Sequence, residues 1–340
     1  MTLKKYRITI NFKLSDKNVF LWVIMWNIDL KELLEFNESL ERIAAKKKQL
    51  SQKRPLPAVA LQKIKEGLSV EWTYNSNSIE GNTLTLRETR IVLEEGMTVK
   101  GKSMREHFEI TNHHDAIEFV ENLVSQHNPL RERDILDIHQ LVMLKIEKEF
   151  SGRFRNAGVR IVGANFLPPN ARKVPDLMAE LVNFINQNPL GLHEVILAAV
   201  FHHRFVWIHP FFDGNGRTVR LVMNLILMQH GYPPAIILKN DRKKYYDALN
   251  QANNGSYKKL LLLVIQALER SLDIYISSFQ DTDDEYLPIS SIVMEADMPY
   301  GQEYVSLLAR SGKIDAYKEG RNWLTTQKAV REYVVKKKKK

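Results

Sequence analysis

The sequence contains no cysteine among its 340 residues. Disulfides and thiolate metal sites are therefore excluded, and nothing in the composition indicates an oxidising compartment. The apolar run near the amino terminus, from Val19 to Trp26, is too short to span a bilayer. No small-residue cleavage site follows that run, so a signal peptide is not indicated. We expect a cytoplasmic protein that does not bind a membrane.

The body of the chain carries little excess charge of either sign. The formal net charge of +9 includes five terminal charges, Lys336 to Lys340, a basic tail that is typically disordered and solvated. The remainder is only mildly basic, so charge is weak support for nucleic-acid binding. The apolar fraction of 44% and the charged fraction of 26% are typical of a globular protein, and the length allows more than one domain.

Apolar residues recur at helical spacing through most of the chain, which predicts an all-α bundle. Thr85 and Glu88 have the spacing of a capping box, so a helix is expected to begin there. Helices are expected at 27–66 with a break around Pro55 and Pro57, and at 70–79, 85–93, 104–125, 132–147, 175–187, 192–207, 217–230 and 242–279.

The helical pattern is interrupted between residues 152 and 169. Here Val159, Ile161 and Val162 precede Gly163, a pattern that predicts a short β-hairpin. An exposed strand edge of such a hairpin can pair with an extended peptide. An ordinary surface hairpin is the alternative interpretation of the same residues.

The composition changes after residue 280. The acidic run from Asp281 to Glu285 indicates a linker. Two short helices, a hairpin and a final helix are predicted over 286–335, an order that resembles a winged helix-turn-helix module. Gln302, Ser306 and Arg310 are its candidate base-contacting residues, while basic and acidic residues balance over the unit. DNA binding through 286–335 and a protein-binding or homodimer-forming role therefore both remain open.

Residues 209–217 carry the most chemistry in the chain. They read His-Pro-Phe-Phe-Asp-Gly-Asn-Gly-Arg, with Arg220 three positions further on, and they lie between two apolar segments long enough to be buried helices. A glycine-rich loop that opens a helix favours phosphate. Asp213 can hold a divalent cation, Arg217 and Arg220 can bind oxyanions, and His209 can move a proton. A plain turn does not require this set, which suits attack of a hydroxyl on a nucleotide phosphate.

The loop resembles the signature of the Fic-domain family, of pattern H-P-F-x-D-G-N-G-R-x-x-R, and matches it at every fixed position. The resemblance implies a Fic-type helical bundle and a transferase that moves AMP from ATP to a hydroxyl of a target protein, with Mg²⁺. Such chemistry needs positioning, charge neutralisation and a proton acceptor. We therefore expect His209 to be the general base and Asp213 to be the metal ligand.

The same reasoning predicts the nucleotide contacts. The expected ATP-binding residues are Gly214, Asn215, Gly216, Arg217, Thr218, Val219 and Arg220. The resemblance alone adds Tyr245, Tyr246 and Asn253 as adenosine contacts. It also implies that a target protein docks on the flap, at Val162, Gly163 and Leu167.

Residues 76–81 read Ser-Asn-Ser-Ile-Glu-Gly, which is similar to the [S/T]-x-x-x-E-[G/N] motif that Fic proteins use for autoinhibition. Ser76 and Glu80 are four apart and share one helix face. Glu80 also lies at a helix end, where the dipole disfavours a carboxylate. The position predicts an ion pair with Arg217 or Arg220. Pairing with Arg217 would leave ATP in an unproductive pose, whereas a surface glutamate that merely ends a helix is the alternative.

Two other functions remain open at this stage. One is a transcription regulator in which the loop senses a nucleotide, and the other is a Fic enzyme that uses another nucleotide donor or removes AMP. The expected organisation is an extension at 1–24, a helical region with the inhibitory motif at 25–103, a catalytic core at 104–280, a winged unit at 286–335 and a basic tail at 336–340.

Overall fold

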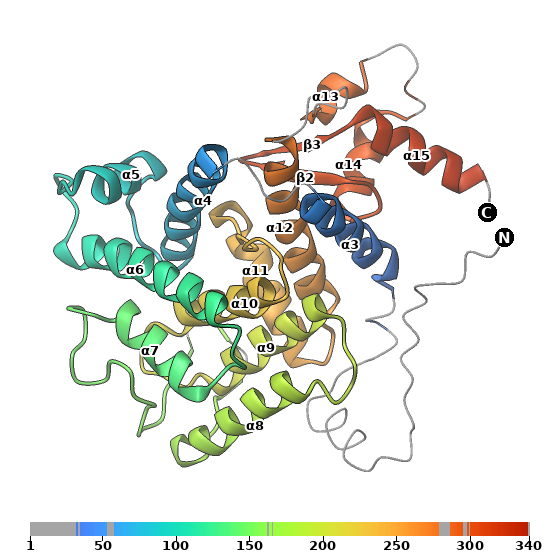
Figure 1. The fold of residues 1–340 in the computed structure, drawn as a ribbon. Coiled ribbons are helices and arrows are strands. Elements are labelled where there is room, and N and C mark those ends of the chain that lie inside the picture. Colours follow the sequence, from blue (N-terminus) through green and yellow to red (C-terminus); the bar gives the residue numbers. More distant parts are fainter. Residues whose placement is uncertain are drawn as a thin grey trace, which may run out of the picture.

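The computed structural model describes residues 32, 35–52, 58–161, 163–164, 166–278, 286–294, 298 and 300–338. They form a helical bundle with one small antiparallel sheet near the carboxyl terminus, which confirms the expected class (Figure 1). No helix within these ranges is both long and apolar enough to cross a membrane. The elements are α3 Asn37–Gln52, α4 Ala58–Ile79, α5 Leu86–Glu95, α6 Met104–Gln126, α7 Glu132–Val142, η1 Ala171–Lys173, α8 Val174–Gln187, α9 Glu194–Ile208, α10 Asn215–Gln229, η2 Lys239–Asp241, α11 Arg242–Asn253, α12 Lys258–Ser277, β1 Leu287–Pro288, α13 Ile289–Ile292, α14 Gln302–Arg310, β2 Ala316–Glu319, β3 Asn322–Thr325 and α15 Gln327–Lys338.

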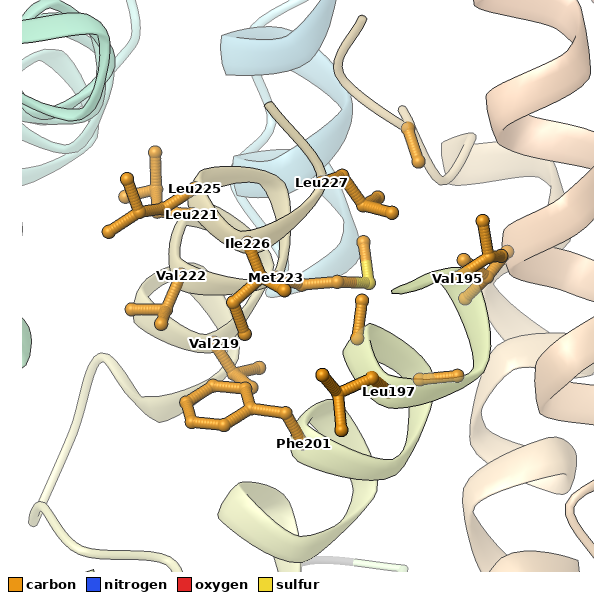
Figure 2. Close-up of a cluster of buried hydrophobic side chains, with 14 of the residues drawn as sticks. Val195, Leu197, Phe201, Val219, Leu221, Val222, Met223, Leu225, Ile226 and Leu227 are labelled. Carbon is orange, nitrogen blue, oxygen red and sulfur yellow. The ribbon is translucent and has the colours of Figure 1, made fainter. Parts of the chain in front are cut away.

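The centre of the bundle is formed by α9 and α10. Both helices are buried along almost their whole length. Figure 2 shows Leu197 and Phe201 of α9 beside Val219 and Met223 of α10 in one apolar cluster. A helix without a polar face is stable only when other helices surround it. The loop between α9 and α10 is therefore held at both ends by buried elements.

The amino-terminal helices belong to the same core. Leu40 and Ile43 of α3 and Trp72 and Ile79 of α4 are buried in the cluster that also contains the central helices. The predicted capping box of α5 is confirmed, since the side chains of Thr85 and Glu88 each bond to the other's backbone amide. Because α4 packs against α6 and α10, its carboxyl-terminal end reaches the central helix.

Three helix predictions are wrong in their extent. The separate stretches expected up to residue 66 and at 70–79 are joined in one helix, α4. The single helix expected at 242–279 is two helices, α11 and α12, because Gly255 adopts a φ of 92° that a continuing helix cannot accommodate. The helix expected at 132–147 ends at Val142, and Lys145 follows with a φ of 60°. In these last two cases a residue with positive φ lies two or three positions beyond the last helical residue, although apolar spacing would have continued the helix.

The hairpin flap predicted within 152–169 is only partly covered by the described residues, because Val162 and Asn165 lie outside them. No strand forms in the described residues of that segment, where the Ala164 amide closes a turn onto the Ile161 carbonyl at 3.2 Å. The buried Arg155 side chain donates to the carbonyls of Ala157 and Pro169, at 2.9 and 2.6 Å. The two carbonyls that flank the predicted strand residues are thus bound by a guanidinium, and proline has no amide hydrogen to donate.

The carboxyl-terminal unit has a core of its own. Its sheet has the strand order β1-β3-β2, with both pairs antiparallel. Ile289, Ile292, Val305, Leu308 and Val330 pack beneath it. The predicted hairpin, the helix from Gln302 and the final helix are confirmed, whereas the first helix extends only over Ile289–Ile292. The predicted extension at 1–24 and the acidic linker lie outside the described residues.

Candidate functional site

The loop between α9 and α10 is closed by its own side chains. α9 ends where His209 adopts a φ of 50°, and Gly214, with a φ of 74°, precedes α10. The Asn215 side chain accepts from the Phe211 amide at 2.9 Å and donates to the Phe211 carbonyl at 2.8 Å. A β-carbon at Gly214 would lie 2.8 Å from the Met143 sulfur, so glycine is required there for space as well as for φ.

α10 begins with backbone amides that no carbonyl of its own helix can reach. Its first intrahelical bond joins the Thr218 amide to the Gly214 carbonyl at 2.9 Å, so the amides of residues 215–217 precede it. Such an end favours an anion, as expected. The side chains of Thr218 and Val219, however, are completely buried, and Val219 lies in the apolar core of Figure 2. Any contact of these two residues with a nucleotide would therefore come from their backbone, and their place in the ATP-binding set stays a prediction.

His139 on α7 supports the loop, and sequence reasoning missed it. Its Nδ1 accepts from the Gly152 amide at 3.0 Å, so Nε2 carries the proton and donates to the Asp213 carbonyl at 3.0 Å. Its ring stacks on Phe211 with centroids 3.6 Å apart. The one sequence signal was its place on the apolar face of α7, three residues before the buried Val142. A histidine there is usually structural, and its role depends on a loop 74 residues away.

The His209 ring at the start of the loop is neutral at pH 7. Burial lowers its pKa to about 4, and the charge of Arg155 acts in the same direction, against an opposing effect of the Val206 backbone. Arg155 also donates from Nε to the His209 carbonyl at 2.7 Å, which fixes the backbone of the residue. A neutral imidazole can accept a proton, as a general base must.

His202 and His203 of α9 have structural roles. His202 Nε2 lies 2.7 Å from the hydroxyl of Tyr245, while His203 contacts Tyr257 at 2.7 Å and Asn253 at 2.9 Å. Two of the three adenosine contacts implied by the resemblance, Tyr245 and Asn253, are thereby held by buried histidines of α9.

We expect the folded state to lose stability steeply on mild acidification. Burial lowers the pKa of His202 to about 3 and the pKa values of His139 and His203 to about 4, from an ordinary value near 6.5. Below pH 6.5 the unfolded chain binds protons on these histidines that the folded chain does not bind. The free energy of unfolding therefore has its full histidine contribution above pH 6.5 and decreases as the pH drops towards 4. Each buried histidine contributes a slope of up to about 1.4 kcal/mol per pH unit. Urea unfolding at pH 7, 6 and 5 measures this, and an unchanged midpoint would contradict it.

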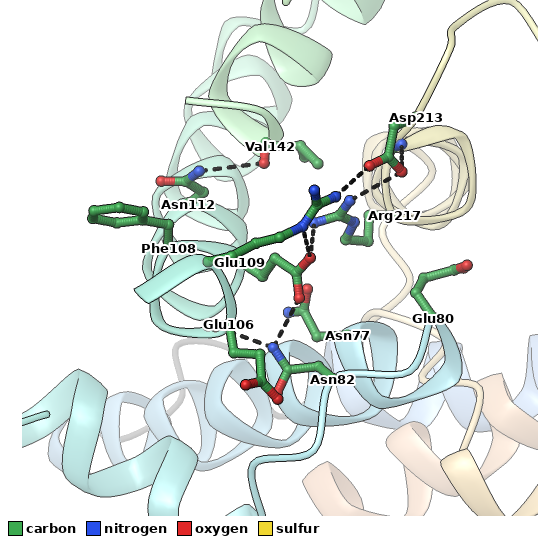
Figure 3. A network of polar contacts seen from close by, with 12 residues as sticks. Asn77, Glu80, Asn82, Glu106, Phe108, Glu109, Asn112, Val142, Asp213 and Arg217 are labelled. Carbon is green, nitrogen blue, oxygen red and sulfur yellow. Dashed lines mark hydrogen bonds and ion pairs between the residues drawn. The ribbon is translucent and has the colours of Figure 1, made fainter. Parts of the chain in front are cut away.

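Asp213 lies in a polar network between the loop and α6 (Figure 3). Its carboxylate contacts Arg105 at 2.6 Å and Arg217 at 3.5 Å. Glu109 of α6 lies 3.6 Å from Arg217 and accepts from Asn82 at 2.9 Å. Burial alone would raise the pKa of Asp213, but Arg217, the Gly214 amide and Arg105 outweigh it and lower the pKa below its ordinary value. The loop therefore presents an ionised carboxylate.

The residues present fit a magnesium ion that is held largely by nucleotide phosphates. Mg²⁺ commonly takes one or two carboxylates and completes its shell with phosphate and water oxygens. Asp213 is half-exposed and ionised, which suits that role. Within the described ranges no group of three or more acidic, histidine or cysteine side chains could hold a metal alone.

Glu80 and Ser76, at the end of α4, both contact Arg220. Glu80 Oε1 lies 2.8 Å from Arg220 Nη2, and Arg220 donates to the Ser76 hydroxyl at 3.0 Å and to the Ser76 carbonyl at 2.7 Å. The Arg220 side chain is only 3% exposed. The predicted ion pair between Glu80 and a loop arginine is present, but its partner is Arg220. Arg217 pairs with Asp213 and Glu109 instead, because both lie beside the first turn of α10.

The Glu80 carboxylate lies directly on the first turn of α10. A β-carbon at Gly216 would be 2.0 Å from Glu80 Oε1, which is far inside van der Waals contact. The carboxylate therefore sits against the backbone whose amides favour an anion. Any phosphate bound to that backbone has to share the space with Glu80 or displace it.

The remaining predicted residues surround this centre. Tyr246 is half-buried and donates to the Ile79 carbonyl at 3.4 Å, one residue before Glu80. Gly163 adopts a φ of 81°, and the Leu167 side chain is 69% exposed. An open groove of about 840 Å³ lies here, lined by residues 156–160 and 167–172.

The chain is similar to proteins of one known family. The Fic/DOC family profile matches residues 129–227. The solved structure of Fic-1 (aa134 - 508) from C. elegans is 31% identical, with a TM-score of 0.65, and the match covers 71% of this chain and 72% of that one. This chain belongs to the Fic/DOC family. The loop that carries His209, Asp213 and the two arginines is thus a Fic loop, in the setting of a Fic fold.

Two curated Fic relatives are also similar. "Protein adenylyltransferase Fic" from Nematostella vectensis is 38% identical over 250 residues, which is 71% of this chain and 56% of that protein. The protein of the same name from Drosophila erecta is 35% identical over 263 residues, which is 77% of this chain and 53% of that protein. The chain spans about half the length of these relatives.

Proposed function

We propose that this Fic protein transfers AMP from ATP to a hydroxyl of a target protein and of its own chain. The observation that carries the proposal is one short loop with His209 at its start and, at its end, the amides of α10 that have no partner within their helix. The hydroxyl oxygen attacks the α-phosphorus, the bond from that phosphorus to the bridging oxygen breaks, and pyrophosphate leaves. His209 takes the hydroxyl proton. The relatives named adenylyltransferases support this reaction over other uses of the loop.

The surrounding residues would bind the phosphates. The amides of residues 215–217 would donate hydrogen bonds to phosphate oxygens, and Arg217 supplies a guanidinium beside them. Arg220 would do the same once released from Glu80. Asp213 would hold Mg²⁺ together with the phosphates, and the bound ion would neutralise their charge. Tyr246, close to the end of α4, and the histidine-held Tyr245 and Asn253 would form the adenosine side of the site.

Transfer from ATP labelled at the α-phosphate, compared with ATP labelled at the γ-phosphate, tests the reaction. The protein should retain only the α label, as a mass increase of one AMP. Retention of the γ label would indicate phosphoryl transfer and overturn the proposal. Competition by CTP, GTP and UTP decides whether the donor is another nucleotide. Loss of AMP from a labelled target without added pyrophosphate would indicate the reverse function.

We also propose that Glu80 inhibits this reaction. Its carboxylate touches Gly216 and pairs with the buried Arg220, so it competes for both the space and the charge that phosphates require. A nucleotide can still approach from the side of Asp213, because Arg217 pairs there with Asp213 and Glu109 rather than with Glu80. Such a nucleotide would lack the Arg220 contact and would be poorly aligned.

The target protein is proposed to dock at the groove beside Gly163 and Leu167. The groove is open and next to the backbone that Arg155 ties to His209, so a docked hydroxyl would be close to the general base. Residues 286–335 are proposed to be a winged helix-turn-helix unit on the order of their elements. We also propose a division of the chain into regions at 1–24, 25–103, 104–280, 286–335 and 336–340. A cytoplasmic location likewise remains a proposal.

DNA binding is not favoured for the carboxyl-terminal unit. Gln266 of α12 donates to the carbonyls of Ala309 and Arg310, at 3.1 Å each, and the hairpin residue Lys318 pairs with Asp241 at 2.8 Å. The end of α14 and the hairpin therefore lie against the bundle. Both would have to separate from it to enter a DNA groove.

Replacing Asp213 by alanine is expected to shift the magnesium dependence of transfer to higher concentration and to lower the rate. The physical reason is that the variant lacks the one loop carboxylate that can share the ion with the phosphates. Magnesium titrations of labelled-AMP transfer measure both effects. Asp137→Ala, on the outer side of α7, is the matched control and should behave as wild type. Identical titration curves for Asp213→Ala and wild type would show that Asp213 is not a ligand.

A further inference from the structure

We propose that the carboxyl-terminal unit holds the inhibitory glutamate in place through η2. This rests on the proposed function, because it names a control of the same site. η2, Lys239–Asp241, lies between the hairpin of β2 and β3 and the end of α4. The proposed connection runs from the hairpin to η2, and from η2 and the start of α11 to the end of α4, which carries Glu80.

The hairpin contacts η2 in two places. Lys318 of β2 pairs with Asp241 at 2.8 Å, and the Asn240 side chain donates to the Gly320 carbonyl at the hairpin tip at 3.1 Å. The side chains of Lys318 and Asp241 are only 16% and 11% exposed. Asp241 also pairs with Lys244 at 3.0 Å, but the Lys244 side chain is 59% exposed, so removing Lys318 leaves the mostly buried carboxylate with a solvated partner that compensates its charge only weakly. The position of η2 therefore depends on the docked hairpin.

η2 and α11 in turn hold the end of α4. The Lys239 amide donates to the Asn75 side chain at 2.8 Å, and Arg242 donates from Nε to the Ile79 carbonyl at 2.7 Å. The last carbonyls of a helix have no intrahelical partner and require donors from elsewhere. Ile79 directly precedes Glu80, so these bonds set where the Glu80 side chain starts. Arg242 is a positioning residue for the inhibitory contact with Arg220.

Other contacts keep the unit docked without η2. Lys46 of α3 pairs with Asp273 of α12 and with Asp315 of the unit, and Gln266 binds the end of α14. Loss of the Lys318 contact should therefore loosen η2 without detaching the unit. A partner that displaces the hairpin would have the same effect on Glu80, which makes the unit a site of control.

The Lys318→Ala variant tests the proposal with two readouts. Self-modification with α-labelled ATP and the affinity for a fluorescent ATP analogue should both rise by about fivefold or more, the lower end of typical coupling between sites. Lys318→Arg keeps the charge and should resemble wild type. Lys313→Ala, an exposed lysine of the same unit, is the matched control. If Lys318→Ala does not fold, Asn240→Ala, which removes the contact with Gly320, replaces it.

The Glu80→Gly background separates this proposal from the proposed function. If the hairpin acts through Glu80, Lys318→Ala should add nothing in that background. An equal increase in both backgrounds, or wild-type values for Lys318→Ala in both readouts, would overturn the control by η2. Absence of labelling in Glu80→Gly itself would count against AMP transfer, and the affinity for the ATP analogue would still decide the role of the hairpin.

Discussion

The His209→Ala variant is expected to lose AMP transfer by about 10²-fold or more, the usual contribution of a general base. The wild-type ring is neutral because burial lowers its pKa to about 4, so it can accept the hydroxyl proton throughout the range from pH 6 to 8. Binding of a fluorescent ATP analogue should change little, because in the proposed function α10 binds the phosphates. Single-turnover transfer at saturating ATP separates the two effects.

His127→Ala is a matched control for this substitution. His127 ends α6 with a φ of 54°, as His209 ends α9 with a φ of 50°, so the backbone consequences of alanine are alike. His127 lies outside the loop, and its variant should retain full transfer. Undiminished transfer by His209→Ala would remove the residue from the mechanism. Loss of ATP-analogue binding together with transfer would assign it to the loop structure instead.

The Glu80→Gly variant is expected to raise self-modification by about tenfold or more, which corresponds to roughly 1.4 kcal/mol. The substitution removes the carboxylate from the first turn of α10 and releases Arg220 for a phosphate. Arg220 keeps its two bonds to Ser76, and water can replace a carboxylate that is 34% exposed, so the unfolding midpoint should change little. Labelled-AMP incorporation under saturating Mg-ATP measures the effect.

Glu95→Gly controls for the loss of a helix-ending glutamate. Glu95 ends α5 directly before Gly96, as Glu80 lies at the end of α4 before Gly81, and it is remote from the loop. Glu80→Gln is a second comparison, because it keeps the side-chain volume and removes the charge. It should show partial activation. Equal labelling in Glu80→Gly and wild type would exclude inhibition by this residue.

The residues proposed to carry the chemistry could be found from the sequence because they are contiguous in it. His209, Asp213 and the loop glycines lie within eight residues, and a helix start imposes its own anion preference whatever surrounds it. Helix positions were predictable for a similar reason, since apolar spacing and the capping box of Thr85 and Glu88 are local properties. Local signals failed where a left-handed residue such as Gly255 ended a helix that spacing would have continued.

Long-range contacts determined the rest. From the sequence, Glu80 could pair with Arg217 or with Arg220. It pairs with Arg220 because α4 packs against α10, which brings Ser76 and Glu80 into contact with an arginine 144 and 140 residues further along the chain. No strand forms in the described residues of the flap, whose flanking carbonyls at Ala157 and Pro169 are bound by the Arg155 side chain, and His139 holds a loop that no sequence motif connects with it. Side-chain periodicity reports which face of an element is buried, whereas the identity of the partner depends on how distant helices pack.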